Sequence, residues 1–279
     1  MRAVYEQPAL ARQDGLWMLN NKRWGRIGGI NGHGYNLTIG KDFLFDEHGY
    51  YGLLFDYGSN TVSGAAGSGE YDSYSLGLYA GNKNKPGSIT GFVSYGLQAN
   101  KGTAYLPVLG QTAESCYDSK TLGIGVEYAY DLDYGKPEEL WHVSPYARLN
   151  FTHYRQKAFR EHGAGVFDRS FGSYSDNYAE GELGLSFDRS EGTGGYGIRL
   201  GYKRILAGER QLMEVCFAED ECGSLLPVRS WGEGRNHFVA AAYVRHDFSR
   251  KWSAGGSLSG DWSNGGREIG ARLDLAYHF

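Results

Sequence analysis

From Trp24 to the C-terminus, apolar and polar residues alternate with a period of two along most of the chain. Such alternation is typical of β-strands whose two faces meet different surroundings. The pattern predicts twelve strands, at residues 24–31, 35–45, 51–59, 71–81, 88–99, 119–131, 141–154, 178–187, 196–206, 237–248, 252–262 and 267–279.

The predicted strands are long, and most of them contain 9 to 13 residues. Strands in soluble sheets average about 5–6 residues, whereas a tilted strand that crosses a bilayer needs about 9–11. Alternation alone also fits a soluble sandwich with a dry core. Strand length is therefore the first feature that favours a membrane barrel.

Two further features favour the barrel. Aromatic residues near strand ends would form girdles at the two membrane interfaces; they are Trp24, Tyr51, Tyr95, Trp141, Tyr202, Trp252, Trp262 and Tyr277. After the second strand, long polar connections alternate with short ones, the long ones being 101–118, 156–177 and 207–236 and the short ones 81–87, 189–195 and 249–251. The expected fold is an all-β, twelve-stranded antiparallel transmembrane barrel.

Helical periodicity occurs only in the first 23 residues, where 9–23 are expected to form a short helix that Gly15 interrupts. We therefore expect residues 1–23 to be a linker and lumen helix, and residues 24–279 to be the barrel. The N-terminus lacks the apolar core of a secretory signal. The chain is accordingly expected to be the C-terminal part of a longer precursor.

The composition agrees with a protein made of strands, since the chain has 43 glycines and 22 tyrosines but only 6 prolines. The net charge of −4 argues against a nucleic-acid partner. No apolar stretch reaches the length of about 18 residues that a transmembrane helix needs. The mean hydropathy of −0.48 still fits a membrane barrel, because lumen-facing residues are polar.

The cysteines suggest at most one disulfide. Cys216 and Cys222 stand in one predicted loop, and in an oxidising compartment they either close a small disulfide or stay free thiols. Cys116 has no obvious partner. The Cys and His spacings match no zinc pattern, so we expect no metal and no cofactor.

Charged residues of both signs occupy predicted inward positions. Those singled out as lumen-facing are Glu127, Arg148, Glu180, Glu182, Arg199 and Arg272. They either solvate the lumen, as in every such barrel, or hold a polar helix in the pore. Glu180 and Glu182 share a face and could act in acid/base chemistry, but a charge ladder with Arg148 on the preceding strand is the favoured interpretation.

Three local sequences carry a resemblance to the autotransporter translocator family. The last strand ends in Leu273-Asp274-Leu275-Ala276-Tyr277-His278-Phe279, a middle strand opens with Trp141-His142-Val143-Ser144-Pro145-Tyr146, and the first predicted strand opens with Trp24-Gly25-Arg26. The resemblance covers about residues 9–279.

The resemblance implies an outer-membrane translocator that anchors and exports a passenger domain covalently linked upstream, with a helix threading the lumen. Its partners would be outer-membrane lipid and the β-barrel assembly machinery, which reads the last strand with Tyr277 and Phe279 as the assembly signal. The barrel is expected to be a monomer in the bacterial outer membrane and not an enzyme.

Asn20 and Asn21 stand at the predicted junction of helix and barrel, before Lys22 and Arg23. Some family members cleave their passenger between two asparagines, by cyclisation of an asparagine side chain onto its own carbonyl. The resemblance makes Asn20 and Asn21 candidates for self-cleavage. The plainer interpretation is a polar helix end.

Two other functions fit the same barrel. An outer-membrane enzyme, either a protease or a phospholipase, would need catalytic Asp/His or Ser/His groups at the outer rim. A passive porin or adhesive barrel would act through its pore or its loops.

Overall fold

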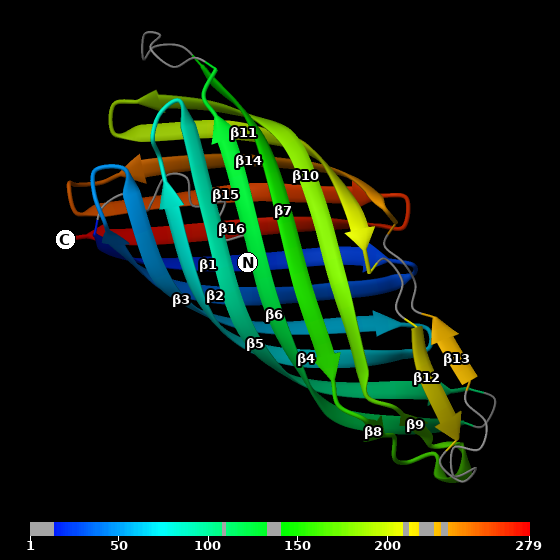
Figure 1. Cartoon of the computed structure of the whole chain (residues 1–279). Helices are drawn as coiled ribbons and strands as arrows, with labels where there is room; N and C mark the ends of the chain where they lie inside the picture. Colours follow the sequence, from blue (N-terminus) through cyan, green and yellow to red (C-terminus); the bar gives the residue numbers. More distant parts are fainter. Residues whose placement is uncertain (1–13, 108–109, 133–140, 209–211, 218–225, 230–233) are drawn as a thin grey trace.

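The computed structural model describes residues 14–107, 110–132, 141–208, 212–217, 226–229 and 234–279. Twelve long strands form one closed antiparallel barrel (Figure 1). They are β1 (Gly15–Ile27), β2 (Ile30–Leu44), β3 (Gly49–Gly64), β4 (Gly67–Asn82), β5 (Gly87–Leu106), β6 (Gln111–Tyr130), β7 (His142–Gln156), β10 (Tyr174–Glu191), β11 (Gly194–Ala207), β14 (Asn236–Asp247), β15 (Trp252–Ser263) and β16 (Gly266–His278). Each overlaps at least one predicted strand, so the expected barrel is confirmed.

The first strand begins at Gly15 rather than Trp24, so residues 15–23 are strand and the helix predicted over them is wrong. Every residue of β1 is paired with β2 on one side and with β16 on the other. This pairing closes the barrel, and such tertiary context overrides weak helix propensity. The part of the expected helix at 9–13 lies outside the described residues.

The connection 101–118, predicted as a long polar loop, is mostly strand. β5 continues to Leu106 and β6 starts at Gln111, and the two remain paired along this whole extension. Their polar side chains gave no sign of a strand because this hairpin stands beyond the apolar belt, where both faces meet polar surroundings.

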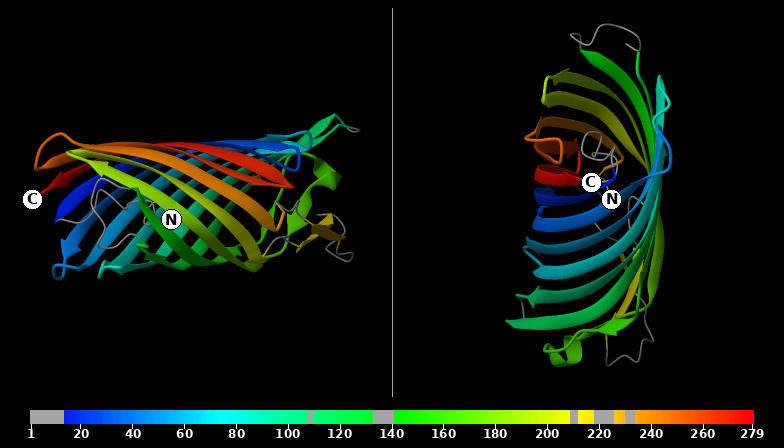
Figure 2. Two further views of the ribbon diagram at one scale, coloured as in Figure 1. Left: turned by 90° about the horizontal axis from the view of Figure 1, so that it is seen from above. Right: turned by 90° about the vertical axis from the view of Figure 1, so that its left-hand side faces the viewer.

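Both ends of the closed sheet lie at one end of the barrel, where Gly15 pairs with His278. At the opposite end, the described parts of the connections 157–173 and 208–235 contribute a second sheet of order β13-β12-β9-β8. Figure 2 (left) shows the C-terminus and β12 at opposite ends of the molecule. Because bacterial barrels carry their long loops outside the cell, we assign the end with the second sheet as extracellular.

The described parts of the extracellular connections are packed against one another. They form β8 (Phe159–Arg160), the 3-10 helix η1 (Gly165–Phe167), β9 (Arg169–Phe171), β12 (Leu212–Phe217) and β13 (Leu226–Arg229). Phe159 stacks between Tyr117 and Phe171, with ring centroids 4.2 and 4.5 Å apart. Arg169 donates two hydrogen bonds of 2.6 Å to the buried Glu161 carboxylate. In the described part of the chain, no helix has the length and apolar character needed to span a membrane.

The outer wall is apolar between two levels of aromatic residues. Leu76, Leu183, Leu258 and Leu273 are 67, 65, 65 and 72% exposed. Aromatic pairs mark the periplasmic level at Phe43–Tyr51 and Trp252–Tyr277, and the extracellular level at Tyr35–Tyr57 and Phe238–Trp262. So much exposed apolar surface marks an interaction face, and its position between aromatic girdles identifies that face as the one that contacts lipid.

Candidate functional site

The inner wall of the barrel carries a row of charged side chains across three neighbouring strands. Glu127 of β6, Arg148 of β7 and Glu182 of β10 are direct cross-strand partners. Arg148 donates from Nε to Glu127 at 2.9 Å and from Nη1 to Glu182 at 3.4 Å. The side chain of Arg148 is 3% exposed, that of Glu127 is 12% exposed and that of Glu182 is 6% exposed. Because water hardly reaches these side chains, their charges neutralise one another.

Arg199 joins this group from β11. Its guanidinium lies 2.6 Å from the Glu127 carboxylate and 3.5 Å from the centroid of the Tyr146 ring. Tyr146 in turn donates from its hydroxyl to Glu182 at 2.7 Å. We call Glu127, Tyr146, Arg148, Glu182 and Arg199 the lumen charge cluster. The contacts within this cluster connect the four strands β6, β7, β10 and β11 to one another.

A second polar group lies nearer the extracellular end. Asp261 of β15 accepts from Lys203 at 2.5 Å and lies 2.6 Å from Nδ1 of His237. Lys203 also lies 3.9 Å from Glu180, which accepts from Asn150 at 2.9 Å. Glu180 is therefore part of a brace between strands and is not isolated with Glu182 as a pair of carboxylates.

The opposite wall is lined by smaller polar contacts. Asn36 accepts from Arg23 at 3.0 Å and donates to Asp56 at 3.2 Å. Arg272 lies 3.3 Å from Asp274 on the same strand. A cavity of about 320 Å³ lies between these groups and the second polar group, and its lining includes Arg23, Asp56, Lys203 and Arg272. The lumen thus holds a polar cavity bounded by charges that already have partners.

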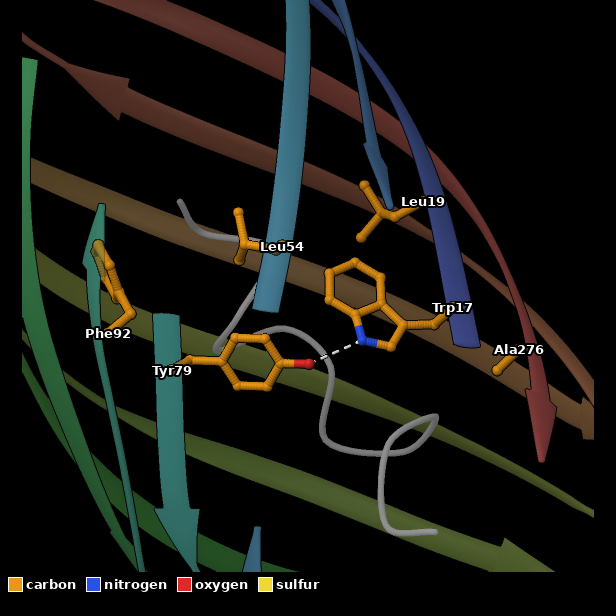
Figure 3. Close-up of a cluster of buried hydrophobic side chains, with 6 residues drawn as sticks. All are labelled: Trp17, Leu19, Leu54, Tyr79, Phe92 and Ala276. Carbon is orange, nitrogen blue, oxygen red and sulfur yellow. Dashed lines mark hydrogen bonds between the residues drawn. The ribbon is translucent and has the colours of Figure 1, made fainter. Parts of the chain in front are cut away.

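Toward the periplasmic end, the lumen wall becomes apolar. Trp17, Leu19, Leu54, Tyr79, Phe92 and Ala276 form a buried cluster (Figure 3). Trp17 donates from its indole nitrogen to the Tyr79 hydroxyl at 2.9 Å and to Asp42 at 3.1 Å. A Cβ on Gly40 would lie 2.1 Å from the Trp17 ring, so glycine makes room for the indole there.

Sequence reasoning missed this cluster because four apolar residues stand in a row at 16–19. Within β1 they alternate, since Leu16 and Met18 are exposed whereas Trp17 and Leu19 are buried. A run of apolar residues does not reveal this alternation. The neighbours Gly40 and Gly52, which accommodate rings from other strands, were the available signal.

Asn20 and Asn21 lie inside β1 and not at a junction. Asn20 is exposed on the outer face, and Asn21 faces the lumen and lines the cavity. Both are paired on both sides, Asn20 with Leu37 and Leu273 and Asn21 with Asn36 and Arg272. The two asparagines therefore meet different surroundings.

The two described cysteines, Cys116 and Cys216, lie at the extracellular end. Cys216 of β12 is buried and disulfide-bonded, whereas Cys116 is free and exposed. Cys222 lies outside the described residues. The pairing of Cys216 with Cys222 therefore stays a prediction, the one that the chain's three cysteines allow when Cys116 is free.

The predicted assembly signal lies at the periplasmic level. Tyr277 packs on Trp252 with centroids 4.9 Å apart, and Phe279 contacts Tyr277 edge-on at 5.4 Å. The Lys41 ammonium lies 5.3 Å from the centre of the Phe279 ring. The backbone N–H of Phe279 donates to Asp14 at 2.9 Å, which extends the closing seam between β16 and β1.

Deleting Phe279 should lower the yield of folded barrel by roughly tenfold or more, equivalent to about 1.4 kcal/mol of apparent assembly free energy. The deletion removes the last seam hydrogen bond and an interfacial aromatic residue. The yield is measured as the heat-modifiable band in isolated outer membranes. Phe279→Trp is the control that keeps the aromatic end, and normal yield after the deletion would contradict the role.

A closed antiparallel barrel with an apolar outer belt, aromatic girdles and a charged lumen defines a transmembrane β-barrel of the outer-membrane type. The model of the family described as the autotransporter beta-domain matches residues 16–259, and the chain belongs to this family. Its role is that of a translocator and membrane anchor, and translocator domains of this family are not themselves catalytic.

Solved structures agree in fold. The translocator domain of the autotransporter NalP from Neisseria meningitidis is 18% identical, with a TM-score of 0.82 over 100% of this chain and 93% of that one. The beta domain of the Bordetella autotransporter BrkA is 15% identical, with a TM-score of 0.74 over 96 and 100%. The transport unit of AIDA-I from Escherichia coli is 11% identical, with a TM-score of 0.63 over 98 and 92%. No curated protein matches the sequence.

Proposed function

We propose that the chain lies in the bacterial outer membrane, where it exports a passenger domain linked upstream of residue 1 and then anchors that passenger. The observation that carries the proposal is the lumen, whose charges are satisfied by one another. Glu127, Arg148, Glu182 and Arg199 form mutual ion pairs. Such a wall keeps the space hydrated without offering a strong binding site to a passing polypeptide.

The partners follow from the same architecture. The described strands of the barrel leave no open edge, since β1 pairs with β16 along its length. A closed barrel needs no second copy to satisfy its backbone, which supports a monomer. The apolar belt supports contact with outer-membrane lipid, and the aromatic end at Tyr277 and Phe279 supports recognition by the β-barrel assembly machinery.

Surface display tests the export proposal. A folded reporter behind a secretory signal is fused ahead of residue 1, and its accessibility to protease and antibody is measured on intact cells. We expect accessible reporter with the barrel and periplasmic reporter when the same fusion lacks the barrel. A heat-modifiable, assembled barrel whose reporter stays in the periplasm would contradict export.

The same fusion tests self-cleavage, and we expect no cut between Asn20 and Asn21. Cyclisation requires the side-chain amide to attack its own carbonyl, with that carbonyl polarised and the geometry held. Asn20 faces outward from a strand that is paired on both sides, away from the charged groups of the lumen. N-terminal sequencing of the membrane-embedded species would reject this expectation if it began at Asn21 and if Asn20→Asp abolished the cut.

A further inference from the structure

Three cations gather on the outer face at the extracellular end of the β16–β1 seam. Arg26 of β1 and Arg267 of β16 are direct cross-strand partners, and both are exposed. Lys22 lies on the same face of β1, with its ammonium 5.2 Å from the centroid of the Trp24 ring. We call Lys22, Arg26 and Arg267 the seam cations.

Among the residues that the structure describes, no carboxylate lies on the outer face of the neighbouring strands. On β15, β16, β1 and β2, as far as the structure describes them, all carboxylates face the lumen; they are Asp42, Asp261, Glu268 and Asp274. Glu268 stands next to Arg267 in the sequence, yet it turns inward toward Arg23 at 4.0 Å. Like charges directly opposite on two strands destabilise a sheet, so an external anion bound between them would stabilise this arrangement.

Two lysines elsewhere at the same end of the barrel lie beside carboxylates. Lys101 of β5 is the direct cross-strand partner of Glu70 of β4, and both are exposed. Lys157, after β7, lies 3.6 Å from Asp118. The seam cations therefore differ from these two lysines, because no described carboxylate lies beside them, although all are exposed at the extracellular end.

The seam cations lie at the height of lipid head groups. Trp262 of β15, an exposed girdle residue, is the cross-strand partner of Arg267. Trp24 lies two residues before Arg26 on the same face of β1. Tryptophan side chains mark the level of the membrane interface. The turns at 28–29 and 264–265 are short and joined by a hydrogen bond of 3.0 Å from Gly28 to Gly265. The rim is thus low where the arginines stand.

We propose that Lys22, Arg26 and Arg267 bind the phosphate groups of a phosphorylated glycolipid in the outer leaflet. Guanidinium groups bind phosphate through two parallel hydrogen bonds, and paired arginines suit a ligand with more than one phosphate oxygen to offer. The acyl chains of such a lipid would lie along the apolar belt below Trp24 and Trp262. The inference rests on the outer-membrane placement in the proposed function, but not on export.

The test uses the purified full chain in neutral detergent, titrated with diphosphorylated lipid A, with the same glycolipid after removal of its phosphates, and with inorganic phosphate alone. Native mass spectrometry measures binding, and the loss of the heat-modifiable band measures the unfolding temperature. We expect binding of the diphosphorylated form only. Arg26→Gln/Arg267→Gln should weaken it about tenfold or more, as expected when two charge-assisted contacts are lost.

The matched control is Lys101→Gln/Lys157→Gln, which removes the same charge from compensated positions and should leave binding unchanged. Without glycolipid, Arg26→Gln/Arg267→Gln should unfold at an equal or higher temperature than the wild type, because repulsion between the arginines is gone. With glycolipid, the same double variant should unfold at a lower temperature than the wild type.

Three results would overturn the proposal. The first is that both double variants bind the glycolipid equally more weakly than the wild type, and the second is that the dephosphorylated glycolipid binds as well as the diphosphorylated one. The third is that Arg26→Gln/Arg267→Gln unfolds at a lower temperature than the wild type when no glycolipid is present. Surface display of the reporter by Arg26→Gln/Arg267→Gln reports on export separately, so a failure of lipid binding is distinguishable from a failure of the proposed function.

Discussion

Arg148→Leu is expected to lower the stability of the folded barrel by about 3–5 kcal/mol, the cost of breaking a buried ion pair by removing one partner. Arg148 lies between Glu127 and Glu182, and its side chain is 3% exposed. Its removal leaves the Glu182 carboxylate with only the Tyr146 hydroxyl as a described hydrogen-bond donor within the lumen charge cluster. Glu127 keeps its contact with Arg199.

The unfolding temperature of the heat-modifiable band and unfolding in urea both measure this loss. The control is Arg148→Met/Glu182→Gln, which removes both charges and keeps an amide oxygen for Tyr146. It should recover at least half of the lost stability, because the carboxylate that lost Arg148 as its ion-pair partner is gone. If the single and double variants are equally unstable, the loss comes from packing and not from the charge left on Glu182.

Leu200→Arg is expected to cost about 2–4 kcal/mol and to reduce the assembled barrel in the membrane, because it places an arginine in the middle of the lipid face. Leu200 is 40% exposed on the outer face of β11, between Tyr196 and Tyr202 of the two girdles. The charge would have to move from water into hydrocarbon. The carboxylates of the lumen could not pair with it, because they lie on the opposite face of the strand.

Leu206→Arg is the matched control for Leu200→Arg. Leu206 is 57% exposed on the same face of the same strand, beyond Tyr202 toward the extracellular end. There the arginine reaches the interface, and the cost should fall to about 0–1 kcal/mol. Equal assembly of the two variants, measured in membrane fractions, would place the bilayer at a different height on the barrel.

The local sequence was enough to determine the architecture and the faces. In β6, Leu122, Ile124 and Val126 face outward and Glu127 inward, as the alternation predicts. A transmembrane strand has lipid on one side and a wet lumen on the other, so every residue is selected by its immediate surroundings. The number of strands and the face that contacts lipid can therefore be predicted from short segments of the sequence.

The start of the barrel could not be determined locally. Residues 16–19 are all apolar, because Trp17 and Leu19 pack into an apolar part of the lumen while Leu16 and Met18 face lipid. Their strand conformation depends on β16, whose residues stand at the other end of the sequence. A pattern confined to the first 23 residues carries no information about that pairing.

The sequence by itself determined that the chain is a twelve-stranded membrane barrel, which side of most strands meets lipid, and which charged residues point inward. Only the tertiary structure decided which inward charges meet. Arg199 reaches Glu127 across 72 positions of the sequence, and Lys203 reaches Asp261 across 58. Register and closure also set Arg26 against Arg267 on the outer face. Alternation assigns a side chain to a face, but its partners follow from strand order, stagger and closure, which are properties of the whole sheet.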